Sequence, residues 1–378
     1  MSSRFHFRAL FAIPVALLVG LGLVLADGGA SHQTLQNPPV KLGTSGGNAN
    51  NISNAFCCSG TLGSLVTNGA TNYILSNNHV LADTDQAVRG EDISQPGLID
   101  VGCNASKAQA VAHFFYAPQL GTANVDAAIA DVATGPSGSP MVDTTGAILD
   151  IGIPSSTTAG PAVNMGVAKS GRTTGLTCAA IGSVSTNVSV QYQKGCNSGK
   201  KFLVTYTNQV VINSSSFSAG GDSGSLIVAS STAQPVALLF AGSSSTTIGN
   251  PISDVAAALG VSFVGGADHA VTCPTSGGGG GPKPKPRGRQ GVVGFDRALA
   301  AKEQYARDLM MDPAIMGVGV GASSEDPSEA VVVIYVEQGR AHGLIPAQLN
   351  GVKTEIIRTD RIRAYSWNEP GSKGCAAK

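Results

Sequence analysis

The chain has 378 residues, and its 24 Lys and Arg balance 24 Asp and Glu, so the formal net charge is zero. This balance argues against a nucleic-acid-binding or polybasic membrane-binding protein, because both normally carry excess positive charge. Hydrophobic residues make up 42% of the sequence, which is enough for a core and too many for a disordered chain. The length predicts two or more domains, and 49 glycines favour short strands joined by tight turns.

The N-terminus has the layout of a secretory signal peptide. Arg4 and Arg8 precede an apolar stretch at 9–26, which ends in small residues at Ala26. This pattern predicts cleavage after residue 26 and a secreted or periplasmic protein, with no stable membrane insertion afterwards. The alternative is an uncleaved anchor, although about 18 residues barely span a bilayer. Residues 27–54 are rich in Gly, Asn and Pro, and we expect a disordered lead or a pro-region there.

Export bears on the seven cysteines, because disulfides are the usual state of cysteines in an oxidising compartment. No C-x-x-C pair or histidine cluster accompanies them, so we expect neither a metal site nor a cofactor. Cys178 and Cys196 flank an alternating segment, and we expect them to pair with each other. Cys103 is expected to pair with Cys57 or Cys58. The odd number of cysteines leaves at least one thiol or an intermolecular bond, and we expect Cys375, near the C-terminus, to be that residue.

Residues 55–272 contain short apolar runs separated by turn signals, which predicts a β-barrel or β-sandwich. We expect strands at 61–66, 73–76, 147–153, 188–192, 202–212, 225–228 and 236–240. One helix is expected at 252–259.

Three polar residues interrupt apolar contexts in this region. His79 follows a predicted strand in Ser-Asn-Asn-His-Val-Leu-Ala, Asp126 lies in Val-Asp-Ala-Ala-Ile-Ala, and Ser223 lies in Gly-Gly-Asp-Ser-Gly-Ser. Each residue alone has a structural interpretation, as a histidine after a strand, a satisfied core carboxylate or part of a glycine-rich turn. Together they supply what acyl transfer by serine needs, namely a nucleophile, a base and an orienting carboxylate. The backbone N–H groups of Gly221 and Ser223 are the candidate oxyanion hole.

These motifs, in the order His, Asp, Ser, resemble those of chymotrypsin-like (trypsin-like) serine proteases of the bacterial exported type. The resemblance covers about residues 55–264 and includes Cys-Ser-Gly-Thr-Leu at 58–62, which is similar to the strand leading to the family's histidine. It implies two six-stranded antiparallel β-barrels, with His79, Asp126 and Ser223 as catalytic residues in the cleft between them. A second glycine and serine phrase at 135–140 has proline in place of the aspartate, and we expect a loop there.

The resemblance also implies a specificity pocket and a role for Asp222. Phe217, six residues before the nucleophile, would lie at the pocket floor, and Phe240, Gly242 and Ser243 would form its wall. Phe217 argues against cleavage after Arg or Lys, and the neighbouring hydroxyls favour a small, polar or acidic residue. Because no activation peptide of the vertebrate type is evident, we expect another group to hold Asp222.

A Gly- and Pro-rich linker at 273–290 separates this domain from a small α+β module at 291–378. The module carries more charge, with a helix expected at 295–311, strands at 315–320, 330–336 and 352–357, and a short helix at 346–349. It resembles a module that precedes trypsin-like domains in exported bacterial proteins. Its role is open between a targeting or binding appendage and an intramolecular chaperone or inhibitor.

The sequence therefore predicts an exported serine endopeptidase that acts on polypeptides through an acyl-enzyme. Two alternatives remain. One is a catalytically silent, protease-like protein that binds peptides without cutting them, and the other is an esterase that uses the same triad.

Overall fold

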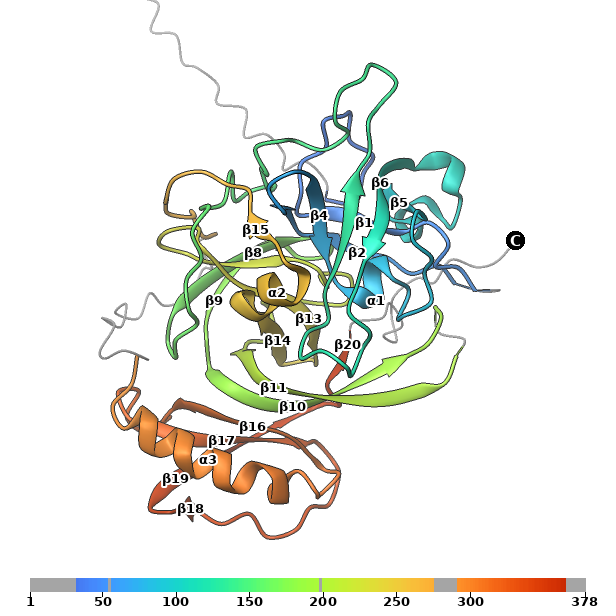
Figure 1. Cartoon of the computed structure of the whole chain (residues 1–378). Coiled ribbons are helices and arrows are strands. Elements are labelled where there is room, and N and C mark those ends of the chain that lie inside the picture. Colours follow the sequence, from blue (N-terminus) through green and yellow to red (C-terminus); the bar gives the residue numbers. More distant parts are fainter. Residues whose placement is uncertain (1–31, 54–55, 197–198, 275–290, 365–378) are drawn as a thin grey trace, which may run out of the picture. The chain divides into compact units, whose positions relative to one another are not determined.

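The computed structural model describes residues 32–53, 56–196, 199–274 and 291–364 (Figure 1). The expected signal peptide, nearly all of the linker and Cys375 lie outside these residues. Within the described part, no helix is both long enough and apolar enough to cross a membrane.

The first sheet is formed by strands from the N-terminal part of the chain together with β15, and it is antiparallel throughout. Its eight strands follow the order β15-β3-β4-β7-β6-β5-β1-β2. They are β1 (Thr44–Asn48), β2 (Gly60–Leu62), β3 (Ser64–Thr67), β4 (Asn72–Ser76), β5 (Asp92–Gln95), β6 (Gln109–Tyr116), β7 (Ala128–Val132) and β15 (Ser262–Phe263). Aliphatic side chains from β3, β4, β6 and β7 fill its core, among them Leu65, Ile74, Val111 and Ile129. Short helices α1 (Asn78–Leu81), η1 (Leu98–Val101) and η2 (Ala105–Lys107) connect the strands.

Two expectations for this part were wrong. Thr44–Asn48 is not a disordered lead but a fully buried strand, β1, paired with β2 and β5. Its small residues serve close packing, since a Cβ added at Gly46 would lie 2.4 Å from the Leu62 side chain. Residues 147–153 form turns with isolated bridges rather than a strand, because Asp150 and Gly152 both take positive φ values, of 62° and 90°.

The second sheet contains the remaining barrel strands and confirms the expected all-β class. These strands are β8 (Gly166–Gly171), β9 (Gly175–Ala180), β10 (Ser183–Gln193), β11 (Lys201–Asn213), β12 (Leu226–Ala229), β13 (Pro235–Gly242) and β14 (Thr246–Pro251). They are neighbours in the order β10-β11-β14-β13-β12-β8-β9. The expected helix at 252–259 is present as α2 (Ile252–Leu259).

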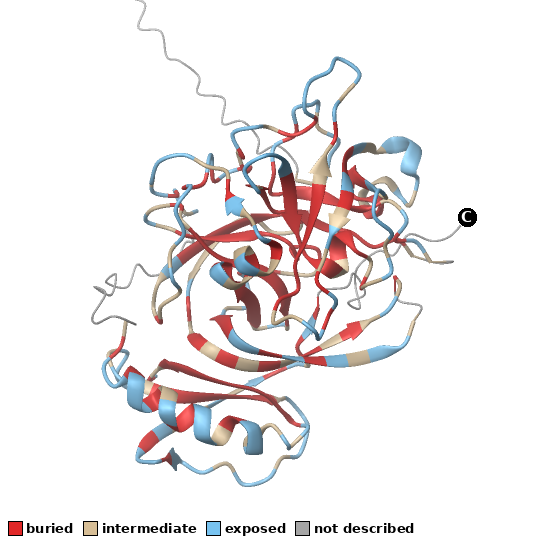
Figure 2. Cartoon of the chain, in the orientation of Figure 1, coloured by how far each residue is buried: buried red, intermediate tan, exposed pale blue. Residues whose placement is uncertain are grey.

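The C-terminal strands continue this second sheet. The C-terminal elements are α3 (Phe295–Leu309), β16 (Ile315–Ala322), β17 (Ala330–Glu337), β18 (Gln348–Leu349), β19 (Val352–Thr359) and β20 (Arg363–Ala364). Strand β16 pairs antiparallel with β10, with Val320 opposite Val184 and Gly317 opposite Val188 (Figure 1). Figure 2 shows β16 and β17 buried along their length, while α3 exposes its outer face.

Buried polar contacts reinforce this junction. Lys302 of α3 is almost fully buried and donates to the Asn187 side chain at 2.7 Å. The hydroxyls of Tyr335 and Ser183 are 2.8 Å apart, and burial raises the pKa of Tyr335 to about 12. These contacts join the C-terminal elements to β10 by side chains as well as by the backbone.

The prediction of a short helix at 346–349 was wrong, because Gln348–Leu349 is the strand β18. It forms a hairpin with β19 in which Leu349 lies opposite Val352. The two connecting residues, Asn350 and Gly351, both take positive φ, as a type I′ turn requires. The Asn-Gly pair was the sequence signal for this hairpin.

Three disulfides are present among the described residues, and they correct one predicted pairing. Cys57 bonds to Cys103, one of the two partners expected for Cys103. Cys178 and Cys196 are both oxidised but do not bond to each other. Cys196, just after β10, bonds to Cys58 near the first sheet. Cys178, on β9, bonds to Cys273 at the end of the barrel region. The error arose because sequence spacing suggests a local bond, whereas the fold places each cysteine beside a distant segment.

Candidate active site

His79 and Asp126 form a buried pair. His79 lies in α1, directly after the central strand β4, and Asp126 lies just before β7, which pairs with β4. The Nδ1 of His79 donates to Oδ2 of Asp126 at 2.6 Å, and the His79 backbone N–H donates to Oδ1 at 3.3 Å. Asp126 has no exposed surface. The carboxylate therefore fixes both the tautomer and the orientation of the imidazole.

Tyr192 is a third donor to Asp126. Its hydroxyl lies 2.8 Å from Oδ2 of Asp126 and 2.8 Å from the hydroxyl of Tyr206. Burial, followed by the negative charge of Asp126, raises the pKa of both phenols, so both stay neutral donors. Since Tyr192 donates its proton to Asp126, Tyr206 donates to Tyr192. Sequence reasoning missed Tyr192 because it is simply one apolar position of the alternating strand β10.

Ser223 lies in the loop before β12, between glycines that the local geometry requires. Gly221 and Gly224 take φ values of +95° and +94°, which favour glycine strongly. A Cβ at Gly224 would lie 2.1 Å from Oγ of Ser76 and 2.2 Å from the Thr61 carbonyl. The N–H groups of Gly221 and Ser223 donate to no group within the described residues. They are therefore available to stabilise negative charge on an oxygen atom.

Thr61, on β2, connects the serine loop to the histidine strand. Its N–H donates to the Ser223 carbonyl at 2.8 Å, and its hydroxyl donates to the Gly221 carbonyl at 3.0 Å. Its own carbonyl accepts a hydrogen bond from the Ser76 hydroxyl at 2.7 Å. Ser76 ends β4, three residues before His79. The predicted Thr61 segment thus lies between the two halves of the site.

The Ser223 hydroxyl donates to the Phe240 carbonyl at 3.4 Å, and not to His79. The Nε2 atom of His79 is buried and has no hydrogen-bond partner among the described residues. A buried, unpartnered imidazole nitrogen costs free energy, and such atoms concentrate at functional sites.

Asp222, next to the serine, is held by the loop after β8 and by Ala219. These donors are the other groups that we expected to hold its carboxylate. The backbone N–H groups of Thr173 and Ala219 donate to its carboxylate at 2.8 and 3.0 Å, and the Thr174 hydroxyl donates at 2.8 Å. The ammonium of Lys169 lies 3.7 Å away, and neither charged side chain is exposed. Burial lowers the pKa of Lys169, while Asp222 opposes this shift.

The four candidate specificity residues lie on both sides of the serine loop. Phe217 is fully buried, with the Lys169 ammonium 5.9 Å from its ring centre. Phe240 packs edge-on against Tyr206. Gly242 ends β13, and the Ser243 hydroxyl lies 2.7 Å from that of Thr246.

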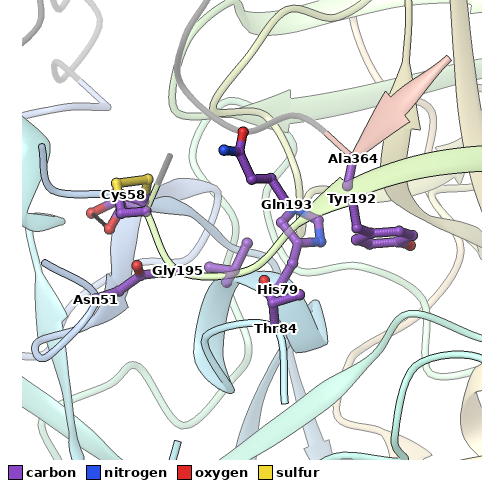
Figure 3. A pocket seen from close by; sticks show the side chains of 11 residues that line it. Asn51, Cys58, His79, Thr84, Tyr192, Gln193, Gly195 and Ala364 are labelled. Carbon is purple, nitrogen blue, oxygen red and sulfur yellow. Dashed lines mark hydrogen bonds between the residues drawn. A yellow bond between two sulfur atoms is a disulfide. The ribbon is translucent and has the colours of Figure 1, made fainter. Parts of the chain in front are cut away.

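A small cavity of about 30 Å³ lies beside His79, which is room for only one or two waters. Tyr192, Gln193, the Cys58–Cys196 disulfide and Ala364 are among the residues that line it (Figure 3). Ala364 belongs to β20, so the C-terminal part of the chain reaches the histidine. The serine phrase at 135–140 lies elsewhere, in an exposed turn, as expected. No group of three or more His, Cys, Asp or Glu in the described part is arranged to hold a metal ion.

The chain matches no protein-family model and no curated protein. It is similar to solved structures of bacterial chymotrypsin-like serine proteases, the family that its motifs resemble. One is a glutamic-acid-specific serine protease that uses a histidine triad in substrate binding (22% identity, TM-score 0.40, 59% of this chain and 100% of that one). Others are an alpha-lytic protease homologue (20%, 0.36, 54% and 91%) and protease A of Thermobifida fusca (16%, 0.34, 55% and 92%). Identities this low carry no information on activity or substrate.

Proposed function

We propose that this chain is an exported serine endopeptidase that uses His79, Asp126 and Ser223. The observation that carries the proposal is the buried hydrogen bond between Asp126 and His79, which leaves Nε2 of the imidazole without a partner. The glycine-hinged loop of Ser223 supports it, because its two N–H groups have no other acceptor among the described residues. The three disulfides support export, since such bonds persist in oxidising compartments.

The reaction proceeds in two acyl-transfer steps. Ser223 turns from the Phe240 carbonyl to His79, gives its proton to Nε2, and its oxygen attacks the substrate carbonyl carbon. The N–H groups of Gly221 and Ser223 stabilise the oxyanion, and Asp126 stabilises the imidazolium. His79 then gives the proton to the leaving amine, which departs and leaves an acyl-enzyme. Water attacks the ester, again with His79 as base, and the carboxylic acid product and the free serine are released.

Labelling with a fluorophosphonate tests the proposal, because the reagent reacts with a serine activated by its histidine. We expect label on Ser223, none in Ser223→Ala, and labelling at least about a thousandfold slower in His79→Ala. Absence of label, or equal labelling in His79→Ala, would overturn the enzyme proposal and favour the silent peptide-binding alternative. Digestion of a peptide library separates the remaining alternative, since an esterase would hydrolyse esters and leave the peptides intact.

The same library tests specificity. We propose a preference for a small, polar or acidic residue before the cut bond, because Phe217 supplies no negative charge and hydroxyls of Ser243 and Thr246 lie after β13. Strong selection for Arg or Lys would overturn this preference without affecting the proposed chemistry.

A further inference from the structure

Strand β20 leaves the other C-terminal elements and joins two strands of the barrel. It pairs antiparallel with β13, with Arg363 opposite Gly242 and Ala364 opposite Ala241. It also pairs parallel with β10 at Gln191, whose N–H donates to the Ile362 carbonyl at 3.1 Å. A segment more than a hundred residues further along the chain is therefore held by backbone pairing on both of its edges.

Strand β20 pairs with a stretch of β10 and a stretch of β13 that form no backbone pairing with any other described strand on that side. On β10, the pairing with β16 ends at Val188, before Gln191 is reached. On β13, the pairing with β12 ends at Leu238, before Ala241 is reached. Unpaired strand edges present N–H and C=O groups that bind an extended peptide by adding it as a strand. The ends of β10 and β13 therefore form a groove for an extended peptide.

The direction of β20 in this groove matches that of a substrate. Because β20 is antiparallel to β13, the step from Arg363 to Ala364 runs from Gly242 to Ala241, toward Phe240. The Phe240 carbonyl is the group to which the Ser223 hydroxyl donates. A polypeptide substrate must likewise approach the nucleophile from its N-terminal side, because the acyl part of the cut bond precedes the amine. Ala364 accordingly lines the same cavity as His79 (Figure 3).

The burial of Ile362 and Ala364 shows that the segment packs into the groove, where it leaves no room for another peptide. Ile362 has no exposed surface, and its N–H donates to the Met316 sulfur at 3.4 Å. Ala364 is also buried, whereas Arg363 between them is exposed. Ser223 has no exposed surface either, and the cavity beside His79, which Ala364 helps to line, measures about 30 Å³, which is too small for an amino-acid side chain with its backbone.

We propose that residues 362–364 are a built-in, substrate-like ligand of the peptide groove between β10 and β13, and that this segment must leave before a polypeptide can bind. The inference rests on the proposed function. It identifies the groove as the binding site for the acyl side of an extended polypeptide, and the chain's own C-terminal segment as its present occupant.

The test compares two variants at one position of the full-length chain. Arg363→Pro removes the N–H of the central paired residue and fixes its φ, which disrupts backbone pairing with Gly242 and Gln191. Arg363→Ala is the matched control, because it removes only an exposed side chain and keeps the backbone groups. If the segment fills the groove nine-tenths of the time, its loss should speed fluorophosphonate labelling of Ser223 about tenfold. We expect that increase in Arg363→Pro and none in Arg363→Ala.

Hydrogen exchange on the unaltered chain provides a second measurement that needs no variant. A peptidyl phosphonate bound covalently to Ser223 would fill the groove, so the backbone amides of residues 362–364 should exchange faster than in the untreated chain. A synthetic peptide of residues 360–367 should slow the labelling of Arg363→Pro, and a scrambled peptide should not.

The outcomes separate the inference from the proposed function. Equal labelling rates in the unaltered chain and a folded Arg363→Pro variant would overturn the inference and leave the endopeptidase proposal intact. Should Arg363→Pro fail to fold, unchanged exchange at 362–364 after phosphonate binding would overturn it instead. Absence of label in every form of the chain would overturn the proposed function itself.

Discussion

Replacing Tyr192 with phenylalanine removes one of the donors to Asp126 and leaves the aromatic ring in place. The hydroxyl of Tyr192 lies 2.8 Å from Oδ2 of Asp126, the same oxygen that accepts from Nδ1 of His79. Neither Tyr192 nor Asp126 is exposed beyond 2% of its surface, so water does not replace the lost donor. We therefore expect the Asp126 carboxylate to be held less firmly in the orientation that serves His79.

The size of the effect follows from the charge on the acceptor. A hydrogen bond to a charged group contributes about 1.5–3 kcal/mol, and about 1.4 kcal/mol corresponds to tenfold in rate. We expect kcat/KM for a peptide substrate to fall about tenfold in Tyr192→Phe, because Asp126 keeps its two contacts to His79. A carboxylate with fewer donors also holds the imidazolium more strongly. The acid limb of the pH profile should therefore move to higher pH.

Tyr206→Phe is the matched control, since it removes a buried hydroxyl of the same kind that does not contact Asp126. It should lose much less activity and leave the acid limb in place. The assay is kcat/KM against pH for both variants, with a thermal unfolding measurement to show that each is folded. Equal losses in the two variants, or a Tyr192→Phe profile identical to that of the unaltered chain, would refute a positioning role for Tyr192.

Three further predictions concern stability. Burial, and to a lesser degree repulsion from Glu91, raises the pKa of Asp83 to about 6. The folded state therefore binds this proton more tightly than the unfolded state, and stability is lost as pH rises from about 4 to about 6. Asp83→Asn should show a smaller fall in Tm across this range, and equal falls would contradict the assignment. Lys169→Met should lower the free energy of unfolding in urea by about 3–5 kcal/mol, because it leaves Asp222 buried without its cation. Lys353→Met removes an exposed ion pair and should cost far less stability, so similar losses would count against the burial argument. Gly224→Ala should abolish folding, measured by circular dichroism, because its Cβ would collide with Ser76 and Thr61. Gly69→Ala, at nearly the same positive φ but with nothing within 4 Å, should fold, and a folded Gly224→Ala would refute the packing argument.

Local patterns in the sequence were sufficient for most strands, because alternation and turn residues act over a few positions. The strands β10 and β11, the helix α2 and the exposed turn at 135–140 were all expected from their own residues. The errors were also local in origin. The apolar residues at 147–153 predicted a strand, but Asp150 and Gly152 turn the backbone there. The residues before the Asn-Gly turn were predicted to form a short helix, but they form the strand β18 of a hairpin.

The polar residues that interrupt apolar runs were visible in the sequence as well. Asp126 stands out because a buried carboxylate needs partners, and the structure brings His79 to it as the motifs suggested. The sequence alone thus determined the all-β class and the residues around which the candidate site is built.

Tertiary structure alone decided which distant segments meet. Tyr192 reaches Asp126 only because β10 passes beside the first barrel, and Cys196 bonds to Cys58 for the same reason. Strand β20 pairs with β13 and with β10 at residues that no other described strand pairs with on that side, and nothing in its own short sequence signals a partner. Pairing between strands uses backbone groups that every residue carries, so the sequence does not encode a backbone partner as it encodes a catalytic side chain.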